Sequence, residues 1–454
     1  MPDSGQMKSR FCDGIARRDL LTVGNAALFG SAWNLPALLQ SQTHAAERRA
    51  SGGIDDKDDV SLIVVFLRGG ASTIDMFDMK PDAPGEIRGE FSPISTNVPG
   101  IQITEHLPRT AQQQDKFSLI RSFTHRNSSH GLADHYMLTG YHPTPAFNSK
   151  LRPNNERPSH GSIISKLKGA RGSVPPYVCL PEMHKSGGSA YLGPGAAPFV
   201  IQADPNAPDF SVPDLLPPLT IDPSRLDARS ELRARLGRFE KTAEETHNRK
   251  ANSFSVFREK AVSLMASAEA KRAFNIEAES AAVRDEYGRT TLGQSCLMAR
   301  RLVEAGVRCV TIQHIDWDTH QENFRLLKDE LLPALDAAMS TLFKDLADRG
   351  MLEKTMVVVT GEFGRTPKID GNAGRGHWGP AFTVAIGGGG IQGGRVIGKT
   401  DDHASKPIED PHGPENLAAT VHHQLGINPE DEFYSAEGRP FKIVNDGKVI
   451  WPLL

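Results

Sequence analysis

The chain has 454 residues, of which 38% are hydrophobic and 24% are charged. These proportions are typical of a soluble globular protein, and the length allows either two or three domains or one large α/β unit with insertions. A formal net charge of −3 gives no overall basic field, so nucleic acid is not an expected partner. Beyond the N-terminal region, no apolar run reaches the roughly 20 residues that a membrane-spanning helix needs.

Residues 1–46 are predicted to be a twin-arginine export signal. Arg17 and Arg18 directly precede a moderately apolar run, and small residues suited to peptidase cleavage follow at Thr43–Ala46. This order is typical of twin-arginine leaders, whereas the alternative is an amphipathic N-terminal helix. We expect residues 47–59 to be a linker and the mature chain to reach the periplasm or cell surface without a stable membrane span.

The cysteines do not form a complete disulfide framework. Cys12 lies in the predicted signal, which leaves Cys179, Cys296 and Cys309 in the mature chain, with no C-x-x-C pair among them. Because this number is odd, we expect buried free thiols.

The mature chain is predicted to alternate between strands and helices. Near-continuous apolar runs indicate buried parallel strands, and this alternation favours a largely parallel sheet covered on both faces. A polar helical insertion is expected at about 205–290. Strands are predicted at 60–70, 117–123, 174–181, 307–313, 355–360 and 381–390. Helices are predicted at 131–140, 291–306, 322–350 and 414–427.

Two segments in the first third of the chain carry polar side chains beside predicted elements. Asp75 and Asp78 follow the Gly-Gly turn that ends the first strand, and His130 precedes the helix at 131–140. A helix N-terminus offers free N–H groups to an anion. The simpler interpretation is that Ser128 or Ser129 only caps this helix.

The richest polar cluster follows the strand at 307–313. Asp318 and His320 are alternate residues of an extended segment, so they are expected to face one ion, with Asp316 beside them. Imidazole and carboxylate together suit zinc, manganese or iron, whereas calcium prefers ligands that are all oxygen. The alternative is a hydrogen-bonded polar turn.

Two glycine-rich turns complete the candidate residues. Glu362 and Arg365 follow the strand at 355–360, and ligands bind at the carboxyl ends of strands in parallel α/β sheets. A Glu–Arg pair that closes a surface turn is the alternative. His377 lies among glycines before the strand at 381–390, where a metal would fix its position.

Several long motifs occur in an order that resembles an exported bacterial family, domain of unknown function 1501. They are "RGGASTIDMFDMKPDAPGEIRGEF", "HGLADHYMLTG", "DEYGRTTLGQSCLMARRLVEAGVR", "WDTH" and "GEFGRTP…GRGHW". The family is placed with the alkaline phosphatase and sulfatase superfamily. The resemblance implies a three-layer α/β/α sandwich with metal-dependent ester hydrolysis at the carboxyl ends of the strands.

The resemblance also implies roles for individual residues. Asp318, or Asp316, together with His320 and His377 is similar to one metal site of the superfamily. Glu362 is a further candidate ligand, whereas Phe363 replaces a histidine. The aspartate that ends the first strand is missing unless Asp75 or Asp78 reaches back. His130 occupies the place of the nucleophile, and Arg365 is expected to hold an anionic substrate.

Two hypotheses follow from these residues. The first is a hydrolase with one divalent ion (zinc, manganese, iron or calcium) that acts on a small-molecule or carbohydrate anionic ester. In it His130 is the nucleophile or acid/base, and Arg365 pairs with the anion. The second is a catalytically inactive exported binding protein on the same fold, for example a carbohydrate or cell-surface module. The sequence leaves the substrate and the oligomeric state open.

Overall fold

The computed structural model describes residues 59–150, 156–212, 267–434 and 438–454. The predicted export signal, nearly all of the predicted linker and residues 213–266 of the predicted insertion lie outside the described residues. Within the described ranges, no helix is both long enough and apolar enough to cross a membrane.

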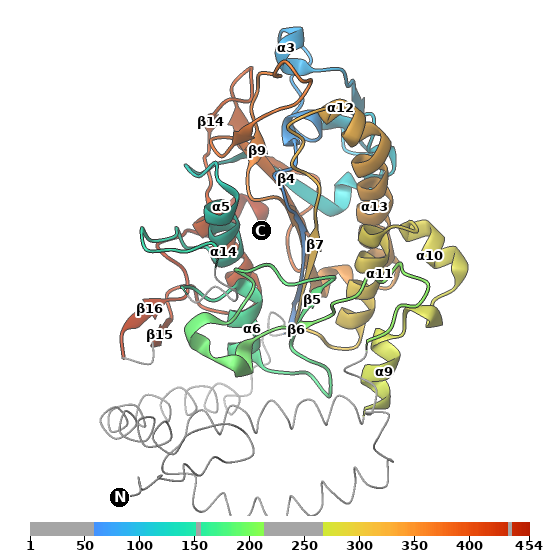
Figure 1. Ribbon diagram of the computed structural model, residues 1–454, viewed down its shortest axis with the longest axis vertical. Coiled ribbons are helices and arrows are strands. Elements are labelled where there is room, and N and C mark those ends of the chain that lie inside the picture. The colour runs from blue at the N-terminus through green and yellow to red at the C-terminus, as the bar shows by residue number, and fades with distance from the viewer. Residues whose placement is uncertain (1–58, 151–155, 213–266, 435–437) are drawn as a thin grey trace, which may run out of the picture.

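An eight-stranded sheet forms the centre of the molecule (Figure 1). All of its neighbouring strands are parallel except at β11, which runs antiparallel to both β4 and β8. The prediction of a largely parallel sheet is therefore confirmed. In spatial order the strands are β12 (Val396–Ile397), β4 (Phe117–Phe123), β11 (Phe382–Gly387), β8 (Thr355–Thr360), β1 (Ser61–Leu67), β7 (Cys309–His314), β5 (Tyr177–Leu180) and β6 (Phe199–Val200).

Helices cover both faces of this sheet. Along β1, Val65 and Leu67 join one hydrophobic cluster, whereas Leu62 and Phe66 join the other. Alternate side chains of a strand point to opposite faces, so an apolar run such as β1 needs a cover on each side. Each fully buried side chain of this kind contributes about 1.5–3 kcal/mol. The α/β/α sandwich is confirmed.

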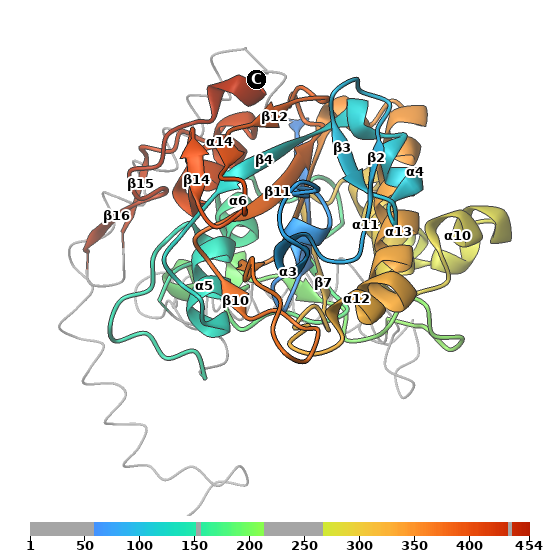
Figure 2. The ribbon, with the colours of Figure 1, turned by 90° about the horizontal axis from the view of Figure 1, so that it is seen from above.

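The two helical layers lie on opposite sides of the sheet in Figure 2. One layer contains α11 and α13, and the other contains α5, α6 and α14. The helices are α3 (Gly85–Arg88), α4 (Pro108–Ala111), α5 (His130–Thr139), α6 (His160–Lys168), α9 (Ala268–Phe274), α10 (Ala281–Tyr287), α11 (Thr291–Glu304), α12 (Asn323–Leu326), α13 (Leu332–Asp348) and α14 (Pro414–Gln424).

Some predicted elements differ in detail from the structure. The helix predicted at 322–350 is α12, a π-helical turn at Leu327–Leu331 and α13. Residues 267–290 of the predicted insertion contain α9, which packs on α11, and α10, which packs on α11 and α13. Cys179, Cys296 and Cys309 are buried free thiols, as predicted.

Short antiparallel pairs of strands lie outside the main sheet. They are β2 (Pro93–Ser95) with β3 (Gln102–Thr104), β9 (Gly364–Arg365) with β10 (His377–Trp378), β13 (Lys399–Thr400) with β14 (Pro407–Glu409), and β15 (Glu432–Tyr434) with β16 (Pro440–Lys442). Of these, the β9–β10 pair matters most for the site, because it joins the segments after β8 and before β11.

The reversed direction of β11 decides what lies at one edge of the sheet. The ends of β1, β7 and β8 are level there, since Leu67 pairs with His314 and Phe66 with Thr360. At the same edge the start of β11 meets the end of β4, where Phe382 pairs with Phe123. Residues that follow β1, β4, β7 and β8 therefore meet residues that precede β11.

Candidate metal centre

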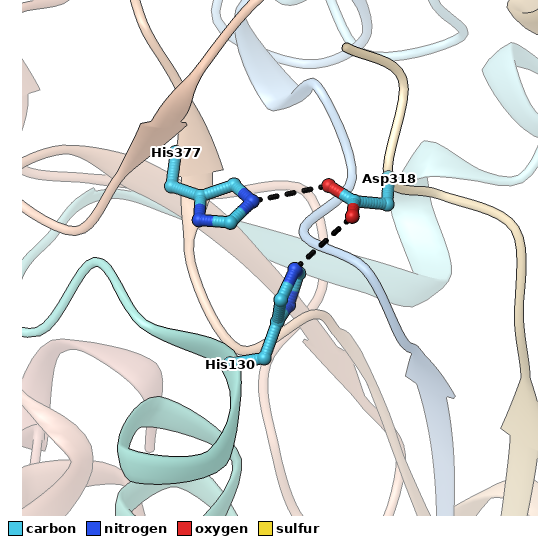
Figure 3. A group of neighbouring side chains, drawn as sticks. All are labelled: His130, Asp318 and His377. Carbon is cyan, nitrogen blue, oxygen red and sulfur yellow. Dashed lines mark hydrogen bonds and ion pairs between the residues drawn. The ribbon is translucent and has the colours of Figure 1, made fainter.

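One carboxylate and three histidines meet at this edge. Asp318 and His320 follow β7, His377 lies in β10, and His130 is the first residue of α5. Figure 3 shows His130, Asp318 and His377 pointing toward one another from three separate segments. We call these four side chains the ligand cluster.

Three members of the ligand cluster form a compact group of donor atoms. Nε2 of His130 lies 3.2 Å from Oδ2 of Asp318, and Nε2 of His377 lies 3.1 Å from Oδ1 of the same carboxylate (Figure 3). One donor atom from each side chain lies within 4.8 Å of the other two. The side chains are 33%, 44% and 21% exposed for His130, Asp318 and His377, so the group is open to solvent.

His320 completes the ligand cluster from its outer side. Its Nε2 lies 3.1 Å from Oδ1 of Asp318 and 2.9 Å from Nε2 of His377. The structure thus brings together Asp318, His320 and His377, which the sequence placed in one metal site. It adds His130, to which the sequence gave a different role.

The Nδ1 atoms of two histidines already have hydrogen-bond partners. Nδ1 of His377 lies 3.0 Å from the carbonyl oxygen of Ser128, and Nδ1 of His130 lies 2.6 Å from Oε1 of Glu362. A carbonyl oxygen only accepts, so His377 donates its Nδ1–H. Histidines that ligate metals commonly donate their other N–H to a carbonyl or carboxylate in this way. Both rings are therefore turned so that Nε2 faces Asp318.

This arrangement leaves lone pairs that face each other. A neutral His377 that donates from Nδ1 carries a lone pair on Nε2, directed at an oxygen of ionised Asp318. Burial, and then the neighbouring charge of His130, lower the pKa of His377 and disfavour a second proton on its ring. A cation held between these atoms removes the repulsion.

The spacing of the donor atoms fits one ion. Ligand atoms bound at about 2.1 Å lie roughly 3.0–3.4 Å apart for octahedral to tetrahedral angles. The atoms of His320, His377 and Asp318 are separated by 2.9 Å and 3.1 Å. Two histidines and one carboxylate on one face also form a known divalent-metal set.

Glu362 supports the ligand cluster from behind. Its side chain is fully buried, and its oxygens accept hydrogen bonds from the backbone N–H groups of Gly69 and Gly70, at 3.0–3.1 Å. Both glycines have positive φ, 117° and 80°, which aims two successive amides at one carboxylate. Burial, and then the charge of Asp134, raise the pKa of Glu362. The hydrogen bond to Glu362 raises the pKa of His130.

Phe363 supplies the apolar floor of the site. Its ring is fully buried, and its centroid lies 5.1 Å from that of His130 and 4.6 Å from that of His377. A phenylalanine does not ligate a metal, but here it limits the tilt of two rings that face Asp318.

Arg365 is buried and fixes the backbone around Asp318. Its guanidinium contacts Oδ1 of Asp318 at 2.5 Å. Partial burial raises the pKa of Asp318, but the hydrogen bond and charge of Arg365 outweigh this and lower it to about 2. The guanidinium also donates to the carbonyl oxygens of Gly69, Gly70, Trp317 and Arg375. With these bonds made, Arg365 is a poor candidate for pairing with a substrate anion.

Two further candidate ligands lie apart from the cluster. Both oxygens of Asp75 are held by the guanidinium of Arg375, and this carboxylate is fully buried. Asp316 is exposed on a turn with φ 76°, and its charge acts on His314. Asp78, the other acidic residue near the first turn, pairs with Lys80 at 3.0 Å.

Sequence analysis missed several residues that shape the site. Arg375 lies in the same glycine-rich turn as His377, and its charge in such a turn was the available signal. The amides of Gly69 and Gly70 had no side-chain signal. Asp134 pairs with buried His184 at 3.1 Å, and nothing in the sequence indicated that contact.

Replacing Glu362 with glutamine is expected to weaken ion binding about 10–100-fold while the ion stoichiometry stays unchanged. The glutamine side chain has the same size, but its NH2 group would face a backbone amide N–H or the Nδ1–H of His130. Two donors that face each other form no hydrogen bond, so the His130 ring would be held less firmly. Competition with a coloured chelator measures the affinity. Glu409→Gln, on the exposed strand β14, is the matched control. An unchanged affinity for Glu362→Gln would contradict the orienting role.

Comparisons with known proteins give one family and several distant structures. The lipoteichoic acid synthase LtaP from Listeria monocytogenes is 12% identical, covers 82% of this chain and 73% of its own, and has a TM-score of 0.34. The PsFucS1 sulfatase from Pseudoalteromonas sp. is 12% identical, with coverages of 90% and 77% and a TM-score of 0.39. The phosphonate monoester hydrolase of Agrobacterium radiobacter is 10% identical, with coverages of 87% and 77% and a TM-score of 0.38.

At these TM-scores the likenesses carry no conclusion about the site of this chain. No curated protein matches the sequence. A family model, by contrast, matches residues 59–454, which include the central sheet, the ligand cluster and the residues around it. The chain belongs to the family described as protein of unknown function (DUF1501).

Proposed function

We propose that this protein is an exported, metal-dependent hydrolase of phosphate or sulfate esters. One observation carries the proposal. Three imidazole Nε2 atoms converge on the carboxylate of Asp318, and in His130 and His377 the Nδ1 atom is hydrogen-bonded to Glu362 and Ser128. This arrangement supports a cation site, and the site is open to solvent. Export by the twin-arginine route is part of the proposal, because that route carries folded, loaded proteins.

The ligand set favours zinc, manganese or iron over calcium. Calcium takes six to eight oxygen ligands, whereas imidazole nitrogen is a common ligand of the transition metals. His130, Asp318 and His377 would hold the ion, with His320 as a fourth donor. This proposal moves His130 from nucleophile to ligand, because its Nε2 faces Asp318.

When bound, a divalent ion lowers the pKa of a water to about 7 and polarises an ester oxygen. The chain supplies the geometry. Glu362 holds the His130 ring through Nδ1, and Ser128 does the same for His377. Arg365 lowers the pKa of Asp318 to about 2, so this carboxylate is ionised at neutral pH. The exposed side of the cluster is where the ester would enter.

Elemental analysis of the mature chain, purified without chelators, is the first test. About one zinc, manganese or iron per chain is expected, and the loaded protein is expected to hydrolyse aryl phosphates or aryl sulfates. The chelated protein should lose this activity and regain it when the ion is returned. If no ion binds, even after reconstitution, the metal-dependent mechanism is wrong.

A catalytically inactive binding protein is the second candidate. It is favoured by the state of Arg365, whose guanidinium bonds to four carbonyls and to Asp318. An ester hydrolase needs a positive charge that pairs with the anionic substrate. Arg365 does not add such a charge to that of the proposed ion, because its guanidinium is already bonded within the protein. Stoichiometric ion binding without hydrolysis of either ester class would select this candidate.

A further inference from the structure

A fully buried ion pair lies beside the ligand cluster. Nε of Arg375 lies 2.8 Å from Oδ2 of Asp75, and Nη2 lies 2.8 Å from Oδ1, so the contact is bidentate. Neither side chain has any exposed surface. Asp75 follows β1 and Arg375 precedes β10, so the pair joins two segments 300 residues apart in the sequence.

Arg375 is tied to the segment that carries His320. Its backbone N–H donates to the carbonyl oxygen of Thr319, at 3.2 Å, and its own carbonyl accepts from Arg365 at 3.0 Å. Thr319 directly precedes His320, and His377 follows Arg375 by two residues. Arg375 is thus linked to the segments of both His320 and His377, and the Nε2 atoms of these histidines are 2.9 Å apart.

Asp75 holds the other end of the same segment. Its Oδ2 accepts from Nδ2 of Asn323, at 2.9 Å, and from Oγ of Ser72, at 2.6 Å. Asn323 in turn accepts a 2.6 Å hydrogen bond from Oγ1 of Thr319. The His320 segment is therefore bound to the ion pair on both sides of His320.

The two segments also touch through their backbones. Asn323 donates to the carbonyl of Ala373 at 2.9 Å, and Glu322 donates to the carbonyl of Asn372 at 3.1 Å. Gly374 lies so close that a Cβ atom there would fall 1.8 Å from the carbonyl oxygen of His320. The backbones of the two segments are therefore in direct contact beside His320.

Stability alone is a weak reason to bury such a pair. Removing two charges from water costs about as much as their attraction returns, so well-packed apolar residues often serve equally well. Arg375 also donates to the carbonyl oxygens of Thr366, Pro367 and Ile87. The other contacts described above link the pair to the segments that carry His320 and His377.

We propose that the Asp75–Arg375 pair is a positioning element that sets the separation of His320 and His377. The use of this separation in ion binding rests on the proposed function. The positioning of the two rings does not depend on that function. The sequence offers Asp75 only as a possible ligand, whereas its contacts with Arg375 and Asn323 fit this indirect role.

The test compares Arg375→Lys with Arg300→Lys. Arg300 is an equally buried arginine, with side-chain exposure of 0% and carboxylate partners Glu279, Glu304 and Asp345 at 2.6–2.9 Å. It lies near the end of α11, which leads into the start of β7, at the edge opposite the ligand cluster. Lysine keeps the charge and loses the planar fork, so both variants lose the fixed guanidinium geometry that contacts their carboxylates.

Crystal structures of the metal-free variants give the first readout. In Arg375→Lys the Nε2 atoms of His320 and His377 are expected to separate beyond hydrogen-bond distance, about 3.5 Å, and in Arg300→Lys they should stay near the wild-type value. Zinc titration gives the second readout: about 10–100-fold weaker binding for Arg375→Lys and no change for Arg300→Lys.

A second pair of variants covers poor folding of the first. Asp75→Asn keeps the size of the side chain, and Asp345→Asn is its control. An unchanged ring separation in Arg375→Lys or Asp75→Asn would overturn the positioning role, and so would equal losses of zinc affinity in a variant and its control. If the wild type binds no ion, the proposed function fails, and the ring separation still decides the positioning role.

Discussion

Replacing His377 with alanine is expected to remove the bound ion, reducing the metal content from about one per chain to a small fraction. His377 offers Nε2 to the site from a ring held on three sides, by the carbonyl of Ser128, the ring of Phe363 and the carboxylate of Asp318. Alanine removes this donor atom. The remaining candidate ligands are more exposed, and each of them loses the ring of His377 as a neighbour. The measurement is elemental analysis after gel filtration, together with zinc titration.

The expected loss of affinity for His377→Ala is at least 100-fold, because removing a direct ligand exceeds the 10–100-fold cost of removing an outer partner. Asp318→Ala should be at least as severe, since Asp318 contacts all three histidines of the cluster. His403→Ala is the control, because His403 is exposed and lies outside the cluster. Full ion content in His377→Ala and Asp318→Ala would show that the site is misassigned.

The strands of the core were predictable because their apolar runs are long and bounded by turns. The segment 117–123 is a strand over the whole predicted range, and 355–360 is another. The direction of each strand was not predictable from periodicity, because a buried strand has the same pattern in either direction. The reversal of β11 is what brings His377 to the carboxyl ends of the other strands.

The chemistry of the site was predictable in its residue types and less so in its contacts. Asp318, His320 and His377 are metal-binding residue types that follow or precede predicted strands, and the structure places them together. The sequence suggests that Arg365 holds a substrate anion or pairs with Glu362 in a surface turn, and it does not show that four carbonyls surround the guanidinium. The sequence offers Asp75 only as a possible ligand and does not show its pairing with Arg375, which is 300 residues away.

Because Arg365 is buried and hydrogen-bonded, we expect its replacement to lower the stability of the protein clearly. In Arg365→Ala, four backbone carbonyls and the carboxylate of Asp318 lose a partner at a site with no exposed guanidinium surface. The carboxylate of Asp318 is 44% exposed, so the loss of its partner costs less than the roughly 3–5 kcal/mol of a fully buried ion pair. The larger part of the loss comes from the buried carbonyl oxygens left without a donor, at about 1–3 kcal/mol each. We expect the metal-free variant to unfold at a clearly lower urea concentration than the metal-free wild type.

The metal-free comparison matters because a bound ion stabilises the folded state by itself, and Arg365→Ala also disturbs a ligand. Arg289→Ala is the control: Arg289 forms an exposed pair with Asp285, which is worth about 1 kcal/mol or less. A loss for Arg365→Ala no larger than for Arg289→Ala would mean that the guanidinium is free. Arg365 would then be available to a substrate anion, and the hydrolase would regain the cation that its ester substrate needs.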